Sequence, residues 1–499
     1  MKRVKEKIYL ALDLGASSGR GILGLFDGEK LRTQEIHRFD HSLCRLNGTT
    51  YWNILDLNRQ CLNALSIASQ KSSDLSGIGI DTWGLDYGLL DQNGQLMGNV
   101  ISYRNSTEMA VKEAWKRISK QELFQTTGVG HLIFNTVYQL YERVLKKDPV
   151  LENAKTLLLL PDLISYFLTG EKGTEYTNAC TTMLLNCSTG AWAQNILQRL
   201  NISSDLFTEV QMPGQLRGCL NQIVSEETGL KATPVYAVAS HDTASAIASI
   251  PAKTEDFVYI SSGTWSLIGI ESDVPILSPE AFQAGYSNEG SLQGKFRLNR
   301  NIMGLGLIQE CRKYWNNNGM NLSWNDIVAA AESSKPFQAF IDPDDVCFYD
   351  LQLIPEKIQK SCSARGWVPK TVGEIARCLY ESLAMKYRYN MDQLEKISGR
   401  RFSVIHIVGG GSYNDLLNQF TANVTGCPVA AGPAEGASMA NILTQAMAAG
   451  EINGIGQLRE VINNSVDVRW FEPQDTAHWT DAYEKYRKLF LKNESEIQY

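Results

Sequence analysis

Several features that indicate a membrane, zinc-binding or nucleic-acid-binding protein are absent from this sequence. No apolar run approaches the roughly 20 residues of a membrane span, and Asp13 interrupts the first apolar run too early for a signal peptide. The 10 cysteines form no C-x-x-C pair, so neither a zinc site nor a redox motif is indicated. The net charge is −7 and no block of Lys and Arg occurs, so nucleic acid is not expected as a partner.

These absences favour a cytoplasmic protein that binds neither membranes nor nucleic acids. Thiols are reduced by default in that compartment. The sequence leaves open whether Cys362 and Cys378 pair, and whether the protein is a monomer or a homodimer.

The chain is long enough for more than one domain. Its 499 residues exceed what one hydrophobic core supports, so two domains are expected. The composition turns polar over residues 251–256, which places the boundary there. The expected domains are 1–250 and 251–499.

A predicted strand, 8–14, opens the chain and leads into Gly15-Ala16-Ser17-Ser18-Gly19-Arg20 before a second strand, 21–26. Backbone N–H groups of such small residues can approach an anion closely, although a plain Gly/Ser hairpin explains the pattern as well. The loop lacks the Gly-Lys-Ser/Thr of a P-loop. Asp13, at the strand end, is a candidate for holding a metal-bound water or simply a turn-forming residue.

The second half of the chain repeats the order strand, small-residue loop, strand. Predicted strands 257–260 and 267–270 flank Ser261-Ser262-Gly263-Thr264-Trp265-Ser266. The repeat indicates a duplication that would place two phosphate loops opposite each other across a cleft. Gly409-Gly410-Gly411 follows another predicted strand and suits an adenine or a phosphate, or a tight turn. Residues 434–449 predict a closely packed helix near these glycines.

Polar residues follow two buried strands of the first half. Asp81-Thr82-Trp83-Gly84-Leu85-Asp86 comes after strand 77–80, and its ring and carboxylates suit a sugar, with a half-buried Trp beside solvated acids as the alternative. Ser240-His241-Asp242-Thr243 comes after strand 235–239. Asp242 could cap the next helix or act as a base.

Longer periodic stretches predict helices at 54–69, 107–125, 137–147 and 374–397. A helical pattern from Asn301 through Tyr314 would put Asn301 and Gln309 on one face. These two amides could contact one elongated ligand or face solvent.

Five motifs occur in a fixed order: 13–20, Gly79-Ile80-Asp81-Thr82-Trp83-Gly84, Ser240-His241-Asp242-Thr243, Ser261-Ser262-Gly263-Thr264-Trp265 and Val408-Gly409-Gly410-Gly411. Together they resemble the FGGY carbohydrate kinases over nearly the whole chain, and most closely the rhamnulokinase branch. The glycerol and xylulose branches carry a Lys-and-Trp pattern where this chain has Asn135-Thr136-Val137-Tyr138-Gln139. That departure disfavours glycerol and xylulose as substrates.

The resemblance implies an α/β, actin-like ATPase (ribonuclease H-like) fold, with two duplicated domains around a deep cleft. It implies ATP with Mg²⁺ as phosphoryl donor and L-rhamnulose, phosphorylated at O1, as acceptor. The alternatives are a kinase for another ketose or deoxyketose, such as L-fuculose, and a non-enzymatic actin-like ATP-binding protein.

The resemblance also implies roles for single residues, with Asp242 as the general base. Mg²⁺ is expected near Asp13. The implied ATP contacts are Ala16, Ser17, Ser18, Gly19, Arg20, Thr264, Gln309 and Gly410. The implied sugar contacts are Gly84, His241, Asp242, Thr243 and Asn301, to which the local pattern adds Trp83.

Overall fold

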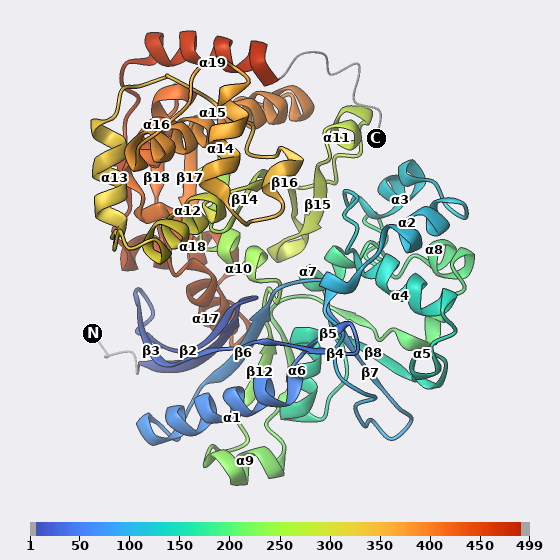
Figure 1. The fold of residues 1–499 in the computed structure, drawn as a ribbon. Helices are drawn as coiled ribbons and strands as arrows, with labels where there is room; N and C mark the ends of the chain where they lie inside the picture. Colours follow the sequence, from blue (N-terminus) through green and yellow to red (C-terminus); the bar gives the residue numbers. More distant parts are fainter. Residues whose placement is uncertain (1–5, 491–499) are drawn as a thin grey trace. The chain divides into compact units, whose positions relative to one another are not determined.

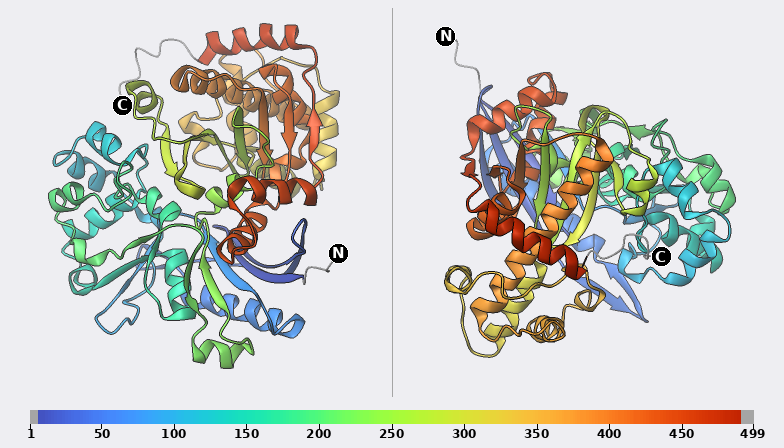
Figure 2. Two further views of the ribbon diagram at one scale, coloured as in Figure 1. Left: turned by 180° about the vertical axis from the view of Figure 1, so that it is seen from behind. Right: turned by 90° about the horizontal axis from the view of Figure 1, so that it is seen from above.

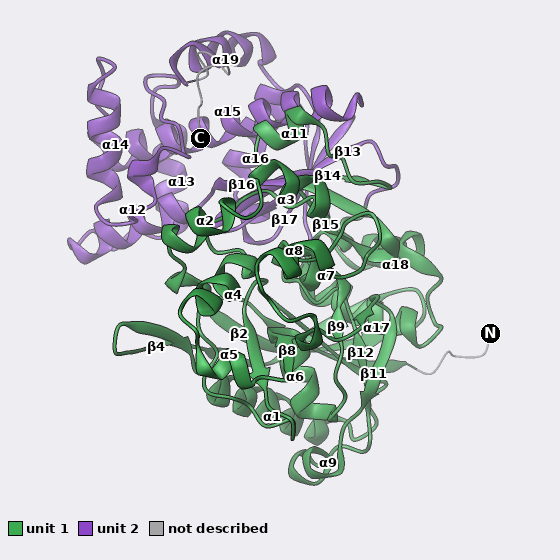
Figure 3. Cartoon of the chain, turned by 90° about the vertical axis from the view of Figure 1, so that its right-hand side faces the viewer, with its two compact units in different colours: residues 1–251, 271–298, 435–466 green, residues 252–270, 299–434, 467–499 purple. Residues whose placement is uncertain are grey.

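The computed structural model describes residues 6–490, which tertiary contacts divide into two compact units (Figure 3). Unit 1 comprises residues 1–251, 271–298 and 435–466, and unit 2 comprises residues 252–270, 299–434 and 467–499. Two late segments of the chain therefore pack with its first half. The functional division into domains 1–250 and 251–499 stays a prediction.

A mixed six-stranded sheet forms the centre of unit 1, in the order β11-β12-β6-β1-β2-β3 (Figure 1). The central strands β1, β6 and β12 are parallel, and the outer strands continue the sheet in antiparallel pairing. Their bounds are β1 (Lys7–Leu14), β2 (Ser18–Phe26), β3 (Leu31–Asp40), β6 (Gly77–Thr82), β11 (Gln215–Cys219) and β12 (Pro234–Ala237).

Both faces of this sheet are covered, which explains why its central strands are largely apolar up to their carboxyl ends. Alternate residues of β1 point to opposite faces. Leu10 and Leu12 pack with α1 (Ile54–Lys71) and α6 (Leu160–Thr169), and Tyr9 and Ala11 pack with α10 (Asp242–Ala248) and α17 (Gly436–Ala448). Figures 1 and 2 show the red α17 beside the blue strands, in agreement with its contacts to β1, β2 and β6.

The remaining elements of unit 1 are short. Its further strands are β4 (Leu43–Leu46), β5 (Thr49–Trp52), β7 (Tyr87–Leu90), β8 (Thr156–Leu159), β9 (Thr174–Glu175), β10 (Val210–Gln211) and β15 (Ser287–Gly290). Its further helices are α2 (Glu108–Trp115), α3 (Lys120–Thr127), α4 (Thr136–Leu145), α5 (Pro149–Asn153), α7 (Tyr176–Ala179), α8 (Gln194–Arg199), α9 (Gln222–Thr228), α11 (Pro279–Gln283) and α18 (Gly454–Ser465).

Unit 2 has its strands in the order β16-β14-β13-β17-β18-β19, and α15 is the helix against which α12, α13, α14 and α16 pack. The strands are β13 (Phe257–Ser262), β14 (Trp265–Ser272), β16 (Phe296–Met303), β17 (Val404–Val408), β18 (Val429–Ala431) and β19 (Arg469–Phe471). The helices are α12 (Gly306–Asn317), α13 (Trp324–Ser333), α14 (Ile354–Ser363), α15 (Val372–Ser398), α16 (Asp415–Thr425) and α19 (Thr476–Phe490).

The two sheets share one topology. The order β3-β2-β1-β6-β12 in unit 1 corresponds to β16-β14-β13-β17-β18 in unit 2. In each, an antiparallel hairpin (β1–β2 or β13–β14) is followed by two parallel neighbours. This confirms the duplication predicted from the repeated strand, loop, strand pattern.

Two predicted helices are wrong. Residues 107–125 form two helices, because α2 ends at Trp115 and Ser119 caps α3 with its hydroxyl. Asn301 lies in strand β16, and α12 begins only at Gly306. Between them the chain turns tightly on Thr264, whose carbonyl accepts from the N–H groups of Gly304 and Gly306 at 3.1 and 3.0 Å.

Cys362 and Cys378 are both buried in unit 2 as free thiols, with their sulfur atoms 3.9 Å apart, within hydrogen-bond distance and without a disulfide bond. Across residues 6–490 no helix combines the length and the apolar character needed to cross a membrane.

Candidate active site

Three carboxylates gather where adjacent parallel strands of unit 1 end. Asp13 on β1 is in register with Asp81 on β6. Thr82, the next residue of β6, forms a bridge with His241, which precedes Asp242. Ligands of open α/β sheets bind at this carboxyl edge of the strands.

Asp242 keeps an accessible carboxylate at this edge. Its Oδ1 accepts from the N–H of Thr243 at 2.6 Å and from the Thr243 hydroxyl at 3.2 Å, and 32% of the side chain is exposed. No donor in the described part of the chain bonds to its Oδ2. His241, not Asp242, occupies the N-cap position of α10. The cap role that the sequence also allowed therefore does not account for Asp242.

The surroundings of Asp242 suit it to accept a proton. Burial, and after it the negative charge of Asp13, raise the pKa of Asp242 to about 7. A base is most effective when its pKa lies near the working pH. The free Oδ2 provides the lone pair for such a transfer.

His241 is oriented by two charged residues that no motif of the sequence indicated. Its Nδ1 lies 3.3 Å from a guanidinium nitrogen of Arg297 and 3.5 Å from Oε2 of Glu289, while its Nε2 lies 3.6 Å from Oδ1 of Asp242. Burial, and then the charge of Arg297, lower the pKa of His241 well below its ordinary value. A neutral ring whose Nδ1 accepts from Arg297 carries its proton on Nε2, on the side of Asp242.

Asp86 anchors the loop that contains Trp83 and Gly84. Its buried carboxylate accepts from the indole N–H groups of Trp52 and Trp83 at 2.6 and 2.7 Å, and from the backbone N–H of Tyr103 at 2.8 Å. Burial raises the pKa of Asp86 to about 7 even though these three donors lower it. One buried carboxylate therefore fixes the position of this loop.

The ring of Trp83 lies in the hydrophobic core rather than half-buried at the surface. It is 6% exposed, with ring centroids 4.2 Å from Trp52 and 5.4 Å from His41. Next to it, Gly84 packs so closely on Thr181 that a Cβ would lie 2.9 Å from the Thr181 hydroxyl oxygen. Trp83 thus anchors the loop in the hydrophobic core.

The loop also contacts the segment that distinguishes this chain from the glycerol and xylulose branches. Leu85 has a φ of 81°, a region that side-chain-bearing residues rarely adopt. Its carbonyl accepts from the hydroxyl of Thr136 at 2.8 Å and from the amide of Gln139 at 3.3 Å, both on α4. The 135–139 segment therefore holds the shape of the Trp83–Gly84 loop.

The first predicted phosphate loop is shorter than expected, because Ser18, Gly19 and Arg20 belong to β2. Ala16 and Ser17 remain in the turn between the strands. Gly19 is required for packing, since a Cβ there would lie 2.3 Å from the ring of Phe39. Arg20 folds back and pairs with Asp13 at 2.7 Å.

Helix α17 supplies polar partners for two of the carboxylates, although it lies more than 350 residues later in the chain. Ser438 donates its hydroxyl to Oδ2 of Asp13 at 2.6 Å, and the Asn441 amide donates to Oδ2 of Asp81 at 2.5 Å. Burial, and then the charge of Asp13, raise the pKa of Asp81 well above its ordinary value. The sequence offered one signal for these partners: polar residues at helical spacing in a helix whose other side chains are mostly small and apolar.

Asp13 fits a magnesium ion through one oxygen. Its Oδ2 is already bonded to Arg20 and Ser438, which leaves Oδ1. Within residues 6–490 no three His, Cys, Asp or Glu side chains form a group that could hold a metal. Mg²⁺ needs only one or two carboxylates, because it keeps several waters and takes phosphate oxygens of the substrate.

The ATP-contact candidates Thr264, Gln309 and Gly410 lie in unit 2. The Thr264 hydroxyl donates to the Gln309 side chain at 3.1 Å, so these two lie together. A Cβ at Gly410 would meet no atom within 4 Å, whereas one at Gly411 would collide with Ser262. Gly411 is therefore needed for packing and Gly410 faces open space. Asn301 is exposed on β16 and not on a helical face with Gln309.

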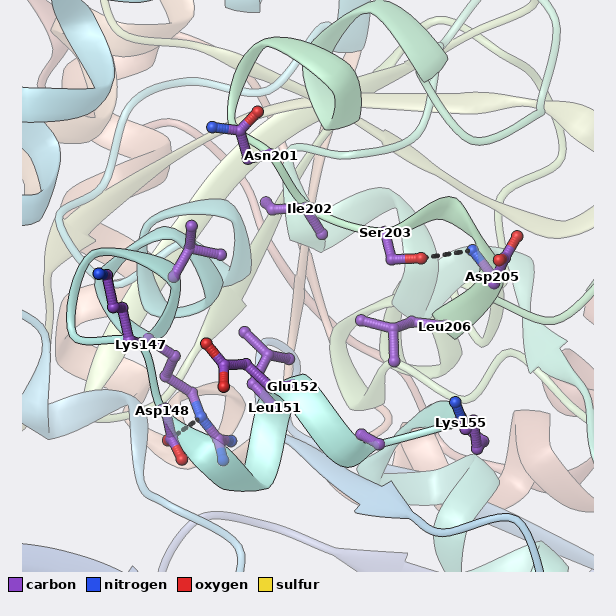
Figure 4. Close-up of a pocket in the computed structure, with 13 residues that line it drawn as sticks. Lys147, Asp148, Leu151, Glu152, Lys155, Asn201, Ile202, Ser203, Asp205 and Leu206 are labelled. Carbon is purple, nitrogen blue, oxygen red and sulfur yellow. Dashed lines mark hydrogen bonds and ion pairs between the residues drawn. The ribbon is translucent and has the colours of Figure 1, made fainter.

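A separate surface pocket of about 340 Å³ lies in unit 1 beside α5 (Figure 4). Apolar side chains such as Leu151 and Leu206 line it together with charged ones such as Lys147 and Asp148. None of the predicted site residues lines it.

Comparison with known proteins gives a consistent result. Residues 8–248 match the N-terminal domain of the FGGY family of carbohydrate kinases, and residues 258–449 match its C-terminal domain. Rhamnulokinase of Bacteroides thetaiotaomicron is 40% identical over 477 residues, covering 95% of this chain and 98% of the relative. Rhamnulokinase of Enterococcus faecalis is 40% identical over 501 residues, covering 99% of both chains.

Solved structures agree on the fold. A gluconate kinase from Lactobacillus acidophilus superposes with a TM-score of 0.82 at 18% identity, covering 99% of both chains. A glycerol kinase from Plasmodium falciparum with ADP superposes with a TM-score of 0.79 at 15% identity, covering 98% of this chain and 99% of that one. These likenesses confirm the expected actin-like ATPase fold class. Because both halves match in order and relatives at 40% identity span nearly the full length, the chain belongs to the FGGY family of carbohydrate kinases.

Proposed function

We propose that this protein transfers the γ-phosphoryl group of ATP to O1 of L-rhamnulose, giving L-rhamnulose 1-phosphate and ADP. The likeness to rhamnulokinases over almost the whole chain supports the choice of sugar. The observation that carries the chemistry is the Asp242 carboxylate, which has a free oxygen and a pKa raised to about 7 at the carboxyl edge of the sheet.

In the proposed reaction Asp242 accepts the proton of the sugar hydroxyl through its free Oδ2. The hydroxyl oxygen forms its bond to the γ-phosphorus as the bond to the ADP oxygen breaks, and ADP carries away that electron pair. Phosphoryl transfer demands positioning and charge stabilisation more than covalent catalysis by the protein. The carboxylate must therefore be ionised and correctly aimed.

The proposed sugar contacts are Gly84, His241, Thr243 and Asn301, with Trp83 supporting the loop that carries Gly84. His241 suits a hydroxyl, because a ring with a proton on Nε2 donates a hydrogen bond.

The proposed ATP contacts are the turn and strand residues Ala16, Ser17, Ser18, Gly19 and Arg20, together with Thr264, Gln309 and Gly410. Mg²⁺ bound through Asp13 Oδ1 would neutralise phosphate charge. The pairing of Arg20 with Asp13 supports a role for Arg20 in holding that carboxylate, and the open space at Gly410 supports close approach of a ligand to the backbone. A cytoplasmic location and a monomeric or homodimeric state remain part of the proposal.

A coupled assay of ADP release over a panel of ketoses tests the assignment. The proposal expects ADP release that requires Mg²⁺ and is fastest with L-rhamnulose. Faster turnover of L-fuculose would reassign the sugar and keep the kinase. Hydrolysis of ATP at the same rate with and without any sugar would overturn the proposed function.

A further inference from the structure

The turn that carries Asp242 is held by a buried carboxylate, that of Glu175, and we propose that Glu175 is a positioning residue for Asp242. The inference rests on the proposed role of Asp242 as the base. Glu175 belongs to β9, a two-residue strand, and is 0% exposed. No motif of the sequence pointed to it.

Glu175 accepts five hydrogen bonds. Its Oε2 accepts from the backbone N–H of Ser240 at 3.1 Å and from the Ser240 hydroxyl at 2.5 Å. The same oxygen accepts from the Thr177 hydroxyl at 2.7 Å and the Asn178 N–H at 3.1 Å, while Oε1 accepts from the Thr177 N–H at 2.8 Å. One side chain thus connects α7 with the residue two positions before Asp242.

A helix-capping role explains only part of this arrangement. Glu175 is the N-cap of α7, which accounts for its bonds to the N–H groups of Thr177 and Asn178. Capping does not account for the two bonds from Ser240, which lies 65 residues further along the chain. These two bonds fix the position of the turn and not the start of α7.

The turn is fixed at further points, so that little freedom is left before Asp242. The His241 N–H donates to the Thr177 hydroxyl at 3.2 Å, and the Ser240 carbonyl accepts from the Thr82 N–H of β6 at 2.8 Å. Helix α10 then begins directly at Asp242. A shift of Glu175 would therefore be transmitted to Asp242 through two residues of constrained backbone.

Glu175 is itself anchored on its other side. Its N–H donates to Oδ1 of Asp162 at 3.1 Å, and that oxygen also accepts from Arg217 at 2.6 Å, in a fully buried pair. All five partners of the Glu175 carboxylate are donors, which stabilises the ionised form against the burial that raises its pKa. A neutral amide cannot replace it, because its NH₂ group would face donors.

Glu175→Gln is expected to lower kcat roughly 10- to 100-fold, the scale of a misplacement of about 1 Å. KM for ATP should stay within about twofold, because the substitution acts on the turn that carries Asp242 and not on the proposed nucleotide contacts. The matched control is Glu142→Gln. Glu142 is 7% exposed, sits on α4 of the same unit and bonds to Thr107 and Lys146, away from the turn.

A double variant separates positioning from general damage. If Glu175 acts through Asp242, Glu175→Gln should lower kcat no further in an Asp242→Asn background. A loss in the double variant equal to the product of the two single losses overturns the inference, as does a kcat for Glu175→Gln equal to that of Glu142→Gln. Near-wild-type turnover of Asp242→Asn alone would instead refute the base, so the two failures are distinguishable.

Ser240→Ala keeps the inference testable if Glu175→Gln does not fold. It removes one donor and leaves the Glu175 carboxylate with four bonds. The expected result is a folded protein with kcat lowered about threefold to tenfold, the equivalent of one lost hydrogen bond, and an unchanged KM for ATP. A folded Ser240→Ala variant with the kcat of the wild type contradicts the inference.

Discussion

The carboxyl edges of the two sheets have the same topology and opposite chemistry. In unit 1, the register pairs Asp13 with Asp81, and Asp242 lies one strand further. In unit 2, the corresponding strands β13 and β17 pair Ser261 with Val408. The duplication thus gives both units the same arrangement of strands, with carboxylates at the carboxyl edge in unit 1 and small neutral groups at that edge in unit 2.

This difference suits the two edges to different parts of a phosphoryl transfer. Carboxylates can accept a proton or hold a cation, but they repel phosphate. An edge of hydroxyls and glycine N–H groups can approach phosphate without that repulsion. The repeat in the sequence indicated the shared strand topology. The side chains at the carboxyl ends of the strands determine which role each unit is proposed to have.

Removing the proposed base at the carboxylate edge should produce the largest change in activity. Asp242→Asn keeps the shape of the side chain and removes its basicity, so kcat should fall by roughly 10²–10⁴. KM for ATP should change little, because the proposed nucleotide contacts are untouched. Steady-state kinetics with L-rhamnulose measure both values, and a kcat close to that of the wild type would show that the carboxylate edge is not catalytic.

Placing a carboxylate at the neutral edge of the unit 2 sheet should remove the difference in charge between the edges of the two sheets. Thr264→Asp introduces a negative charge at a proposed phosphate contact, and at about 4 Å such repulsion amounts to roughly 4 kcal/mol near a protein surface before ionic screening. KM for ATP should rise at least about tenfold. Thr264→Asn, similar in size and uncharged, is the control, and equal KM values for the two variants would contradict the role given to this edge.

The raised pKa of Asp242 should appear as a pH dependence of activity. Because the base must be ionised, kcat/KM should fall about tenfold per pH unit below a pKa of about 7. The profile is measured from pH 5 to 9 with saturating ATP. A flat profile between pH 5 and 7 would mean that Asp242 is not the titrating base.

The same pKa predicts that the charge on Asp242 destabilises the fold. A carboxyl whose pKa is higher in the folded than in the unfolded protein favours folding fully below its unfolded value of about 3.9, and this contribution is lost as the pH rises through about 7. Asp242→Asn should therefore raise Tm at pH 8 by at least about 2 °C and less at pH 5. Thermal denaturation at both pH values checks this, and a Tm increase that does not depend on pH would contradict it.

The smallest expected effect concerns the hydrogen bond that fixes the Trp83–Gly84 loop. Trp83→Phe keeps an aromatic ring, although a smaller one, and removes the indole N–H that donates to Asp86. Loss of this one bond to a buried carboxylate should raise KM for the sugar roughly threefold to tenfold and leave KM for ATP unchanged. Equal rises in both values would show that Trp83 stabilises unit 1 in general and not the Trp83–Gly84 loop in particular.

The sequence was sufficient to predict several central strands. Strands 8–14, 77–80 and 404–408 were predicted because short apolar runs ending in polar or glycine-rich turns have few alternative structures. The prediction for Asn301 failed because its spacing to Gln309 imitated a helix, while Gly304 and Gly306 determined a turn against Thr264.

The partners of the site residues depend on tertiary structure and could not be predicted in the same way. Asn441 reaches Asp81 across 360 positions, and Ser438 reaches Asp13 across 425. Local pattern does not encode such pairings. Glu175 was missed for the same reason, because its importance depends on Ser240 lying beside it in the folded chain.

The proposed mechanism depends most on the activation by Asp242 of O1 of L-rhamnulose for attack on ATP. Phosphorus NMR of the reaction mixture tests this step directly, with the wild type and Asp242→Asn measured side by side. We expect one sugar-phosphate resonance coupled to the C1 protons, from a product formed in equal amount with ADP and at a rate lower in the variant by roughly 10²–10⁴. Inorganic phosphate as the product, formed at the same rate in both proteins, would contradict the mechanism.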